Sequence, residues 1–231
     1  MASASTTLMA SVSGVSTFWI WHMALFGWDA MRVGGGPPPV SAKPKMVLVP
    51  PGCGLSTFVE YVENPWHSGG NRHGVRDANA ILRTIQDPQS GTNLVDAMGY
   101  YAQKVGGEDQ LDKWHRLCFR ALIKHQQAAP ADACGVILCG ADLAQRGFDC
   151  FIGDGDVQSL TTGKAEAGVR KLRPEEVAVV LPDANDAARR GPPGERVDAA
   201  HAKRCVANYA ALAERYPTQV RRERDLSFLL R

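Results

Sequence analysis

Residues 46–60 read MVLVPPGCGLSTFVE. The apolar start of this segment, MVLV, indicates a short strand buried on both faces, as a central strand of a parallel sheet is. Gly52 and Gly54 then allow backbone conformations that other residues avoid. Ser56 and Thr57 are of the residue types that cap the start of a helix. The segment therefore predicts a strand, a glycine turn and a helix in direct succession.

The turn in this segment has the composition of an anion site. The first turn of a helix carries unpaired amide donors and a partial positive charge, so a glycine turn that leads into it forms a concave pocket for an anion. The candidates to hold a phosphate there are Pro51, Gly52, Cys53, Gly54, Leu55, Ser56 and Thr57. Ser56 is also the candidate ligand for Mg²⁺, through its hydroxyl. The plain alternative is that the segment is a strand-to-helix turn with no ligand.

One position departs from the chemistry that phosphate transfer needs. The common phosphate-loop pattern is GxxxxGK[ST], which this sequence matches at Gly54 and Ser56 but not at Val49 and Leu55. The lysine of that pattern neutralises the β and γ phosphates, whereas leucine offers neither charge nor donor. We therefore expect binding without efficient transfer, unless another lysine replaces the missing one. The lysines to test for such a replacement are Lys43, Lys45 and Lys164.

Further apolar runs alternate with helical patterns along the chain. Buried strands are predicted at residues 134–140 and 177–181, because both are short continuous apolar runs. Apolar positions at helical spacing predict helices at residues 93–105, 110–127 and 197–216. This alternation indicates one α/β domain. In an open parallel sheet the carboxyl ends of the strands share one edge, so we expect Gly140 and Asp142 to lie near the glycine turn.

The order of these features resembles that of the P-loop nucleotide kinases. A Pro-Pro-Gly phosphate loop is followed by an acidic stretch, a VILCG strand, an arginine-bearing segment and a terminal helix. The order is also similar to the kinase-like P-loop domains of some double-stranded RNA viruses, including the phytoreovirus segment-seven-type domain shared with fungal chrysoviruses. The resemblance covers residues 44–216. It implies a three-layer αβα fold with a mostly parallel sheet, and ATP or GTP with Mg²⁺, or an RNA phosphate, as the ligand.

The same resemblance implies candidate catalytic residues outside the loop. Kinase-like members of the class use an acidic residue on the strand after the first helix, and Asp77 is the only carboxylate in residues 74–82. The alternative role for Asp77 is to cap the helix that follows it. Nucleotide kinases also keep arginines in a mobile lid before a long helix, where they clamp phosphates. The matching lid candidates are Arg189, Arg190 and Arg196.

Composition limits the remaining classes of protein. The formal net charge of +2 is nearly balanced, so the chain lacks the basic field of a dedicated nucleic-acid coat protein. The six cysteines form no CxxC pair and no cluster with zinc-ligand spacing. We therefore expect neither a structural metal nor a disulfide scaffold, and a reducing cytoplasmic setting.

The two ends of the chain differ from the predicted domain, residues 41–216. Residues 1–40 form an apolar arm that ends in a Gly/Pro linker, and Asp29 and Arg32 are its only charged side chains. Its most apolar run, residues 15–28, is shorter than the roughly 20 residues that span a bilayer, so no membrane partner is expected. The arm is expected either to pack on its own domain or to dock tryptophans into another subunit. Residues 217–231 are expected to form an amphipathic docking tail, with RNA as a further possible contact.

Three functions follow from these features. The first is a degenerate phosphate-loop domain that binds a nucleotide or RNA phosphate with weak or no transfer, in a viral particle or in viral replication. The second is a capsid-associated or interaction protein that keeps only the fold and meets other viral proteins through the arm. The third is an active nucleotide kinase or NTPase with a relocated lysine.

Overall fold

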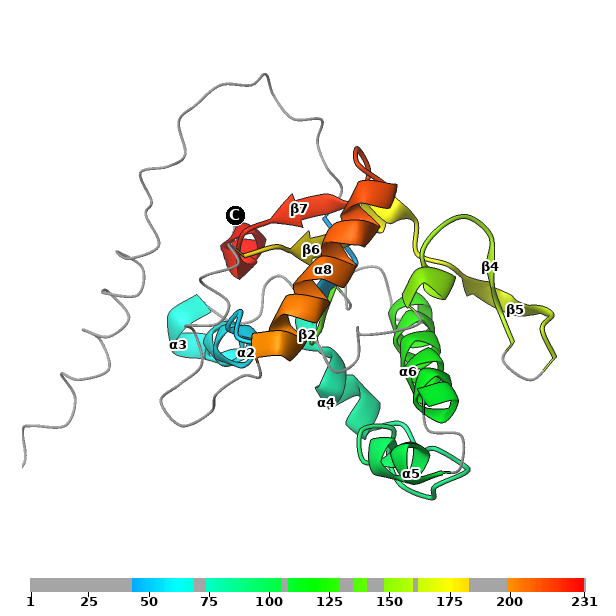
Figure 1. The fold of residues 1–231 in the computed structure, drawn as a ribbon. Coiled ribbons are helices and arrows are strands. Elements are labelled where there is room, and N and C mark those ends of the chain that lie inside the picture. The colour runs from blue at the N-terminus through cyan, green and yellow to red at the C-terminus, as the bar shows by residue number, and fades with distance from the viewer. Residues whose placement is uncertain are drawn as a thin grey trace, which may run out of the picture. The chain divides into compact units, whose positions relative to one another are not determined.

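The computed structural model describes residues 43–68, 74–104, 108–128, 135–140, 148–159, 162–182 and 199–230 (Figure 1). The chain divides into two units, Met1–Ser41 and Ala42–Arg231, and every described residue belongs to the second unit. The predicted apolar arm, residues 1–40, lies outside the described residues.

The centre of the second unit is a five-stranded sheet in the order β2-β3-β1-β6-β7. All its neighbouring strands pair in parallel. The strands are β1 (Met46–Leu48), β2 (Val75–Asp77), β3 (Val136–Cys139), β6 (Val177–Val180) and β7 (Arg221–Glu223). The strand of the glycine-turn segment, β1, therefore occupies the middle position. The predicted α/β class with a mostly parallel sheet is confirmed.

Helices connect and cover these strands. The α-helices are α2 (Leu55–Glu63), α3 (Pro65–Ser68), α4 (Ala78–Arg83), α5 (Ala97–Gln103), α6 (Glu108–Ala128) and α8 (Ala199–Arg215). The 3₁₀ helices are η2 (Phe148–Phe151), η3 (Pro174–Glu176) and η4 (Leu226–Leu230). The helix predicted at residues 93–105 is shorter, because Asn93 accepts from the amides of Val95 and Asp96 with its side chain and forms a turn before α5.

The side chains of β1 alternate between two apolar layers. Val47 and Val49 pack on one face of the sheet with residues of α2 and η4. Met46 and Leu48 pack on the other face with residues of α4, α5, α6 and α8. Because strand side chains point alternately to opposite faces, helices on both sides require a strand that is apolar throughout. This arrangement is the three-layer αβα fold that the resemblance implies.

The C-terminal residues add to the sheet. The segment predicted as a docking tail, residues 217–231, contains β7, which pairs in parallel with β6. It also contains η4, whose Leu226, Phe228 and Leu229 are buried in the layer beneath α2. These residues therefore complete the core of the second unit and do not form a separate tail.

A two-stranded antiparallel hairpin lies outside the main sheet. It consists of β4 (Asp156–Gln158) and β5 (Ala165–Arg170), and it lies beside α6 (Figure 1). Glu166 of β5 forms ion pairs with Arg120 and Lys124 of α6. Gln127 of α6 donates to the carbonyl of Arg170 at 2.5 Å and accepts from its amide at 3.2 Å. These contacts fix the hairpin to the helix.

Among the residues that the structure describes, no helix combines the length and the apolar character needed to cross a membrane.

Candidate functional site

The glycine turn lies directly between β1 and α2, as predicted. At the end of β1 the amide of Val49 donates to the carbonyl of Cys139 at 2.9 Å. The chain then turns, and the amide of Cys53 donates back to the carbonyl of Pro50 at 3.3 Å. Gly52 and Gly54 have φ angles of 75° and 73°, in the left-handed region that favours glycine. The two glycines are therefore required by the backbone of the turn.

The first amides of α2 are available to a ligand. The first hydrogen bond of the helix joins the amide of Phe58 to the carbonyl of Gly54 at 2.8 Å, so the amides of the three residues before Phe58 have no intrahelical partner. The side chains of Ser56 and Thr57 are exposed. A Cβ atom at Gly54 would meet nothing within 4 Å, so the space above the turn is open.

The turn lies at the topological switch point of the sheet, where the strand order reverses. After β1 the chain adds β2 and β3 on one side, and it then adds β6 and β7 on the other side. In open α/β sheets ligands bind outside the carboxyl ends of the strands at such a point. Leu55 Cδ1 lies 3.7 Å from the position of a Cβ at Gly140, so the start of α2 lies beside the end of β3, as expected. Asp142 lies outside the described residues.

Leu55 stands at the position of the lysine in the phosphate-loop pattern, and it makes an apolar contact. Its side chain is half-buried and packs against the apolar layer of Val47 and Leu138, which α2 covers. The site therefore combines backbone donors with an apolar wall. Such a site can hold an anion by hydrogen bonds but supplies no ammonium group at position 55 to the phosphates.

The three lysines considered as replacements lie elsewhere. Lys43 and Lys45 precede β1, at the end of the strand opposite to the turn, and Lys45 Nζ lies 2.9 Å from Glu176 Oε1. Lys164 lies between the strands of the β4–β5 hairpin, and Figure 1 places this hairpin on the far side of the unit from α2. The geometry therefore offers no replacement among these three.

Asp77 has the capping role that the sequence left open. It is the last residue of β2, and its Oδ1 accepts from the amide of Asn79 at 3.1 Å at the start of α4. Burial raises the pKa of Asp77, and the amide of Asn79 and the charge of Arg83 only partly offset this effect. Since β3 separates β2 from β1, Asp77 lies at the same edge of the sheet as the turn but two strands away.

The remaining site predictions concern the lid arginines and the metal ligand. Arg189, Arg190 and Arg196 lie outside the described residues. Ser56, the candidate metal ligand, is an exposed residue in the first turn of α2. Within the described ranges, no group of three or more His, Cys, Asp or Glu residues is arranged to hold a metal ion.

Two polar clusters were not predicted from the sequence. One surrounds Glu176, a buried carboxylate that accepts from Arg170 and from the amide of Arg173. The other lines a pocket between α6 and the loop before α5, where Arg120 and Lys124 meet Glu166. The available signal was the helical spacing of Arg120 and Lys124, but their shared partner is distant in the sequence.

The chain matches no family model, and a comparison with curated proteins finds no match.

Proposed function

We propose that the turn from Pro51 to Thr57 binds the phosphate of a nucleotide, ATP or GTP with Mg²⁺, or a phosphate of RNA. Phosphate transfer by this site is weak or absent. The observation that carries the proposal is the set of open amides at the start of α2, at the carboxyl end of the central strand. Hydrogen bonds to a charged acceptor contribute about 1.5–3 kcal/mol each, and the positive end of the helix adds to them.

Leu55 limits both the affinity and the chemistry. A lysine at this position would balance the charge that develops on the transferred phosphate, and the apolar contact of Leu55 does not. We expect a dissociation constant on the order of 0.1–1 mM for Mg-ATP, which corresponds to about 4–5.5 kcal/mol. Binding by amides alone also predicts little preference between ATP and GTP, because no side chain of the turn is expected to recognise the base.

The biological context of this phosphate binding is part of the same proposal. The resemblance to kinase-like domains of double-stranded RNA viruses supports a role in the virus particle or in replication in the cytoplasm. Capsid or other viral proteins would then contact the apolar arm, residues 1–40.

Calorimetric titration of the full chain with Mg-ATP and Mg-GTP tests the proposal. The decisive variant is Gly54→Asp, which places a carboxylate beside the amides. Gly54→Asn is its matched control, because asparagine has the same shape and both residues tolerate a left-handed backbone. We expect the Asp variant to lose detectable binding while the Asn variant keeps most of it. Equal binding by the two variants, or no heat with the wild type at millimolar nucleotide, would contradict the proposal.

A second function is favoured by the packing of Leu55. Its contact with the apolar layer suits a protein that keeps the fold for assembly alone. Deletion of residues 1–36 should then abolish assembly or partner binding without unfolding the second unit. A truncated protein that still assembles normally would exclude this function.

A third function, an active kinase with a relocated lysine, predicts loss of ATP turnover in Lys45→Ala or Lys164→Ala. Lys45 pairs with Glu176 at the far end of β1, so we expect neither variant to change nucleotide binding.

A further inference from the structure

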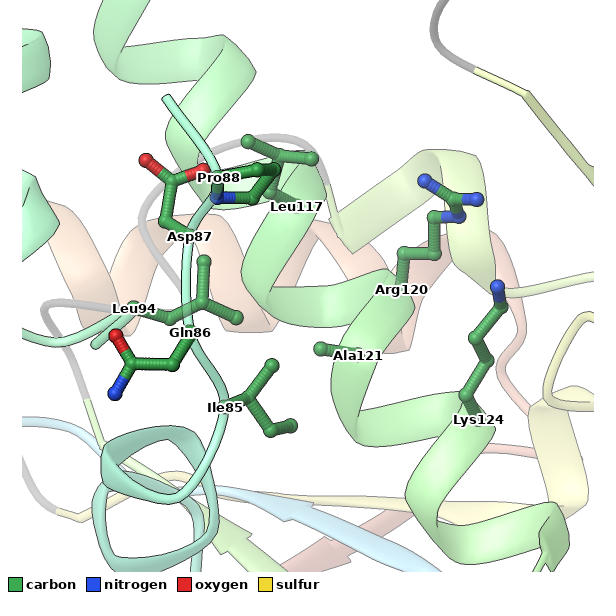
Figure 2. A pocket seen from close by; sticks show the side chains of 9 residues that line it. All are labelled: Ile85, Gln86, Asp87, Pro88, Leu94, Leu117, Arg120, Ala121 and Lys124. Carbon is green, nitrogen blue, oxygen red and sulfur yellow. The ribbon is translucent and has the colours of Figure 1, made fainter. Parts of the chain in front are cut away.

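A pocket lies between α6 and the loop that joins α4 to α5. It is an open pocket of about 200 Å³. Its lining residues are Ile85, Gln86, Asp87, Pro88, Leu94, Leu117, Arg120, Ala121 and Lys124. Figure 2 shows apolar side chains from the loop and from α6 around the gap, with the charged ends of Arg120 and Lys124 together at one side.

The apolar part of this pocket is preformed. The loop is closed by a hydrogen bond from the amide of Leu94 to the carbonyl of Ile85 at 2.9 Å. It is fixed to α6 by the indole of Trp114, which donates to the carbonyl of Leu94 at 2.7 Å in a buried position. Because both walls are held by buried contacts, an apolar ligand would not have to order them on binding.

The rim on α6 is positively charged. Arg120 and Lys124 lie one helical turn apart and share one carboxylate, Glu166 of β5. Among the described side chains at this rim, one positive charge is therefore in excess. The side chain of Lys124 is 45% exposed, so its ammonium group can also bind an anion on the pocket side.

The opposite wall carries a carboxylate that is already engaged. Asp87 is buried, and its oxygens accept from the hydroxyl of Tyr101 at 3.3 Å and from the amide of Ser90 at 2.9 Å. The two walls therefore differ in charge. A bound anion would be oriented toward Lys124 and away from Asp87.

We propose that this pocket binds a compact organic monoanion, with its apolar body between Ile85, Leu94 and Leu117 and its carboxylate at Lys124. The pocket is smaller than the roughly 300–1,000 Å³ of sites for drug-sized ligands, which limits the apolar body to about one ring. The site is separate from the turn before α2, so its occupation is independent of the proposed nucleotide binding.

Titration of the full chain with benzoate, followed by amide chemical shifts, tests this site. We expect saturable shifts at residues of the pocket, and a weaker response to benzamide, the neutral molecule of the same shape. Lys124→Gln should weaken benzoate binding about fivefold, the upper end for an exposed ion pair. Ala121→Leu should abolish binding, because the larger side chain fills the pocket while leucine remains a good helix former.

Arg116→Gln is the matched control for charge. Arg116 is exposed on α6, two turns before Lys124, and does not line the pocket. Its variant should bind benzoate like the wild type. Equal affinity for benzoate and benzamide, unchanged binding in both Lys124→Gln and Ala121→Leu, or the absence of saturable shifts in the folded wild type would overturn the proposal.

Discussion

The two ends of the central strand β1 handle charge in opposite ways. At its N-terminal end, Glu176 is buried and accepts from Lys45, Arg170 and Arg173, so side-chain charges are paired. At its carboxyl end, the turn before α2 offers backbone amides, and Leu55 stands where a lysine would supply charge. Among the described residues, β1 therefore has ion-paired side chains beside its N-terminal end, whereas the turn after its carboxyl end presents backbone amides and an apolar side chain.

Substitution of Glu176, at the end of β1 with paired charges, should have the largest effect on stability. Glu176→Leu leaves Lys45, Arg170 and Arg173 without their shared carboxylate, although the backbone hydrogen bond from the amide of Lys45 to the carbonyl of residue 176 remains. We expect the free energy of unfolding to fall by about 2–3 kcal/mol, since the partners are partly exposed and can be hydrated. Urea denaturation measures this change. Glu175→Leu is the control, because the neighbouring Glu175 is only half-buried and its ion pair is with the exposed Arg173. An equal loss in both variants would contradict the role of Glu176.

The paired end should also set the stability in acid. Burial raises the pKa of Glu176, but hydrogen bonds from Arg170, from the amide of Arg173 and from Lys45 together lower it to about 2. A carboxyl whose pKa is lowered in the folded state stabilises it above the unfolded pKa, and this contribution is lost as the pH falls to the folded value. Stability should therefore decrease between about pH 4.5 and pH 2.

Glu176→Gln tests this pH dependence, because glutamine keeps the shape without the titrating group. The slope of unfolding free energy against pH should become shallower in this range. A residual slope should remain, because the hydrogen bond from Arg120 and that from Lys124 hold the pKa of Glu166 at about 2 as well. A slope identical to that of the wild type would contradict the assignment.

At the carboxyl end of β1, Leu55→Lys should sharpen the comparison by adding the missing charge. The side chain starts in the first turn of α2, beside the end of β3, so the ammonium can reach a phosphate held by the turn. We expect affinity for Mg-ATP to rise about tenfold, or about 1.4 kcal/mol, with a gain of measurable hydrolysis. Leu55→Met is the uncharged control. Unchanged affinity in the lysine variant would show that the turn does not hold phosphate.

Asp77 should give the smallest effect, and one on stability alone. Asp77→Ala removes the cap of α4 and should cost about 1 kcal/mol, whereas Asp77→Asn keeps a capping side chain and should cost a few tenths. Neither change should alter binding of Mg-ATP in calorimetry. Loss of Mg-dependent binding in Asp77→Asn would instead assign this residue to the metal.

The sequence predicted the strand-to-helix junction after β1 better than the edges of the sheet. Continuous apolar runs mark β1, β3 and β6, because strands buried on both faces must be apolar throughout. Local glycine and hydroxyl residues mark the turn and the start of α2. These features depend on short-range geometry, so the junction could be read from residues 46–63.

The edge strand β7, the burial of Glu176 and the β4–β5 hairpin could not be predicted from the local sequence. The strand β7 is Arg-Arg-Glu and carries no apolar signal, since it forms the edge of the sheet. Glu176 lies in a polar stretch that resembles an exposed turn, and its partners are Lys45, just before β1, and Arg170 of β5. The hairpin is mostly exposed, so its strands show little alternation of apolar and polar residues. Each of these features arises from contacts between distant parts of the chain.

The most direct test of the account is the response of individual backbone amides to phosphate. Inorganic phosphate, and then Mg-ATP, would be titrated into the full chain while amide chemical shifts are recorded. We expect the largest shifts at Gly54, Leu55, Ser56 and Thr57, with little change at Lys45 and Glu176. Shifts confined to other residues, or none at the start of α2 at millimolar ligand, would contradict it.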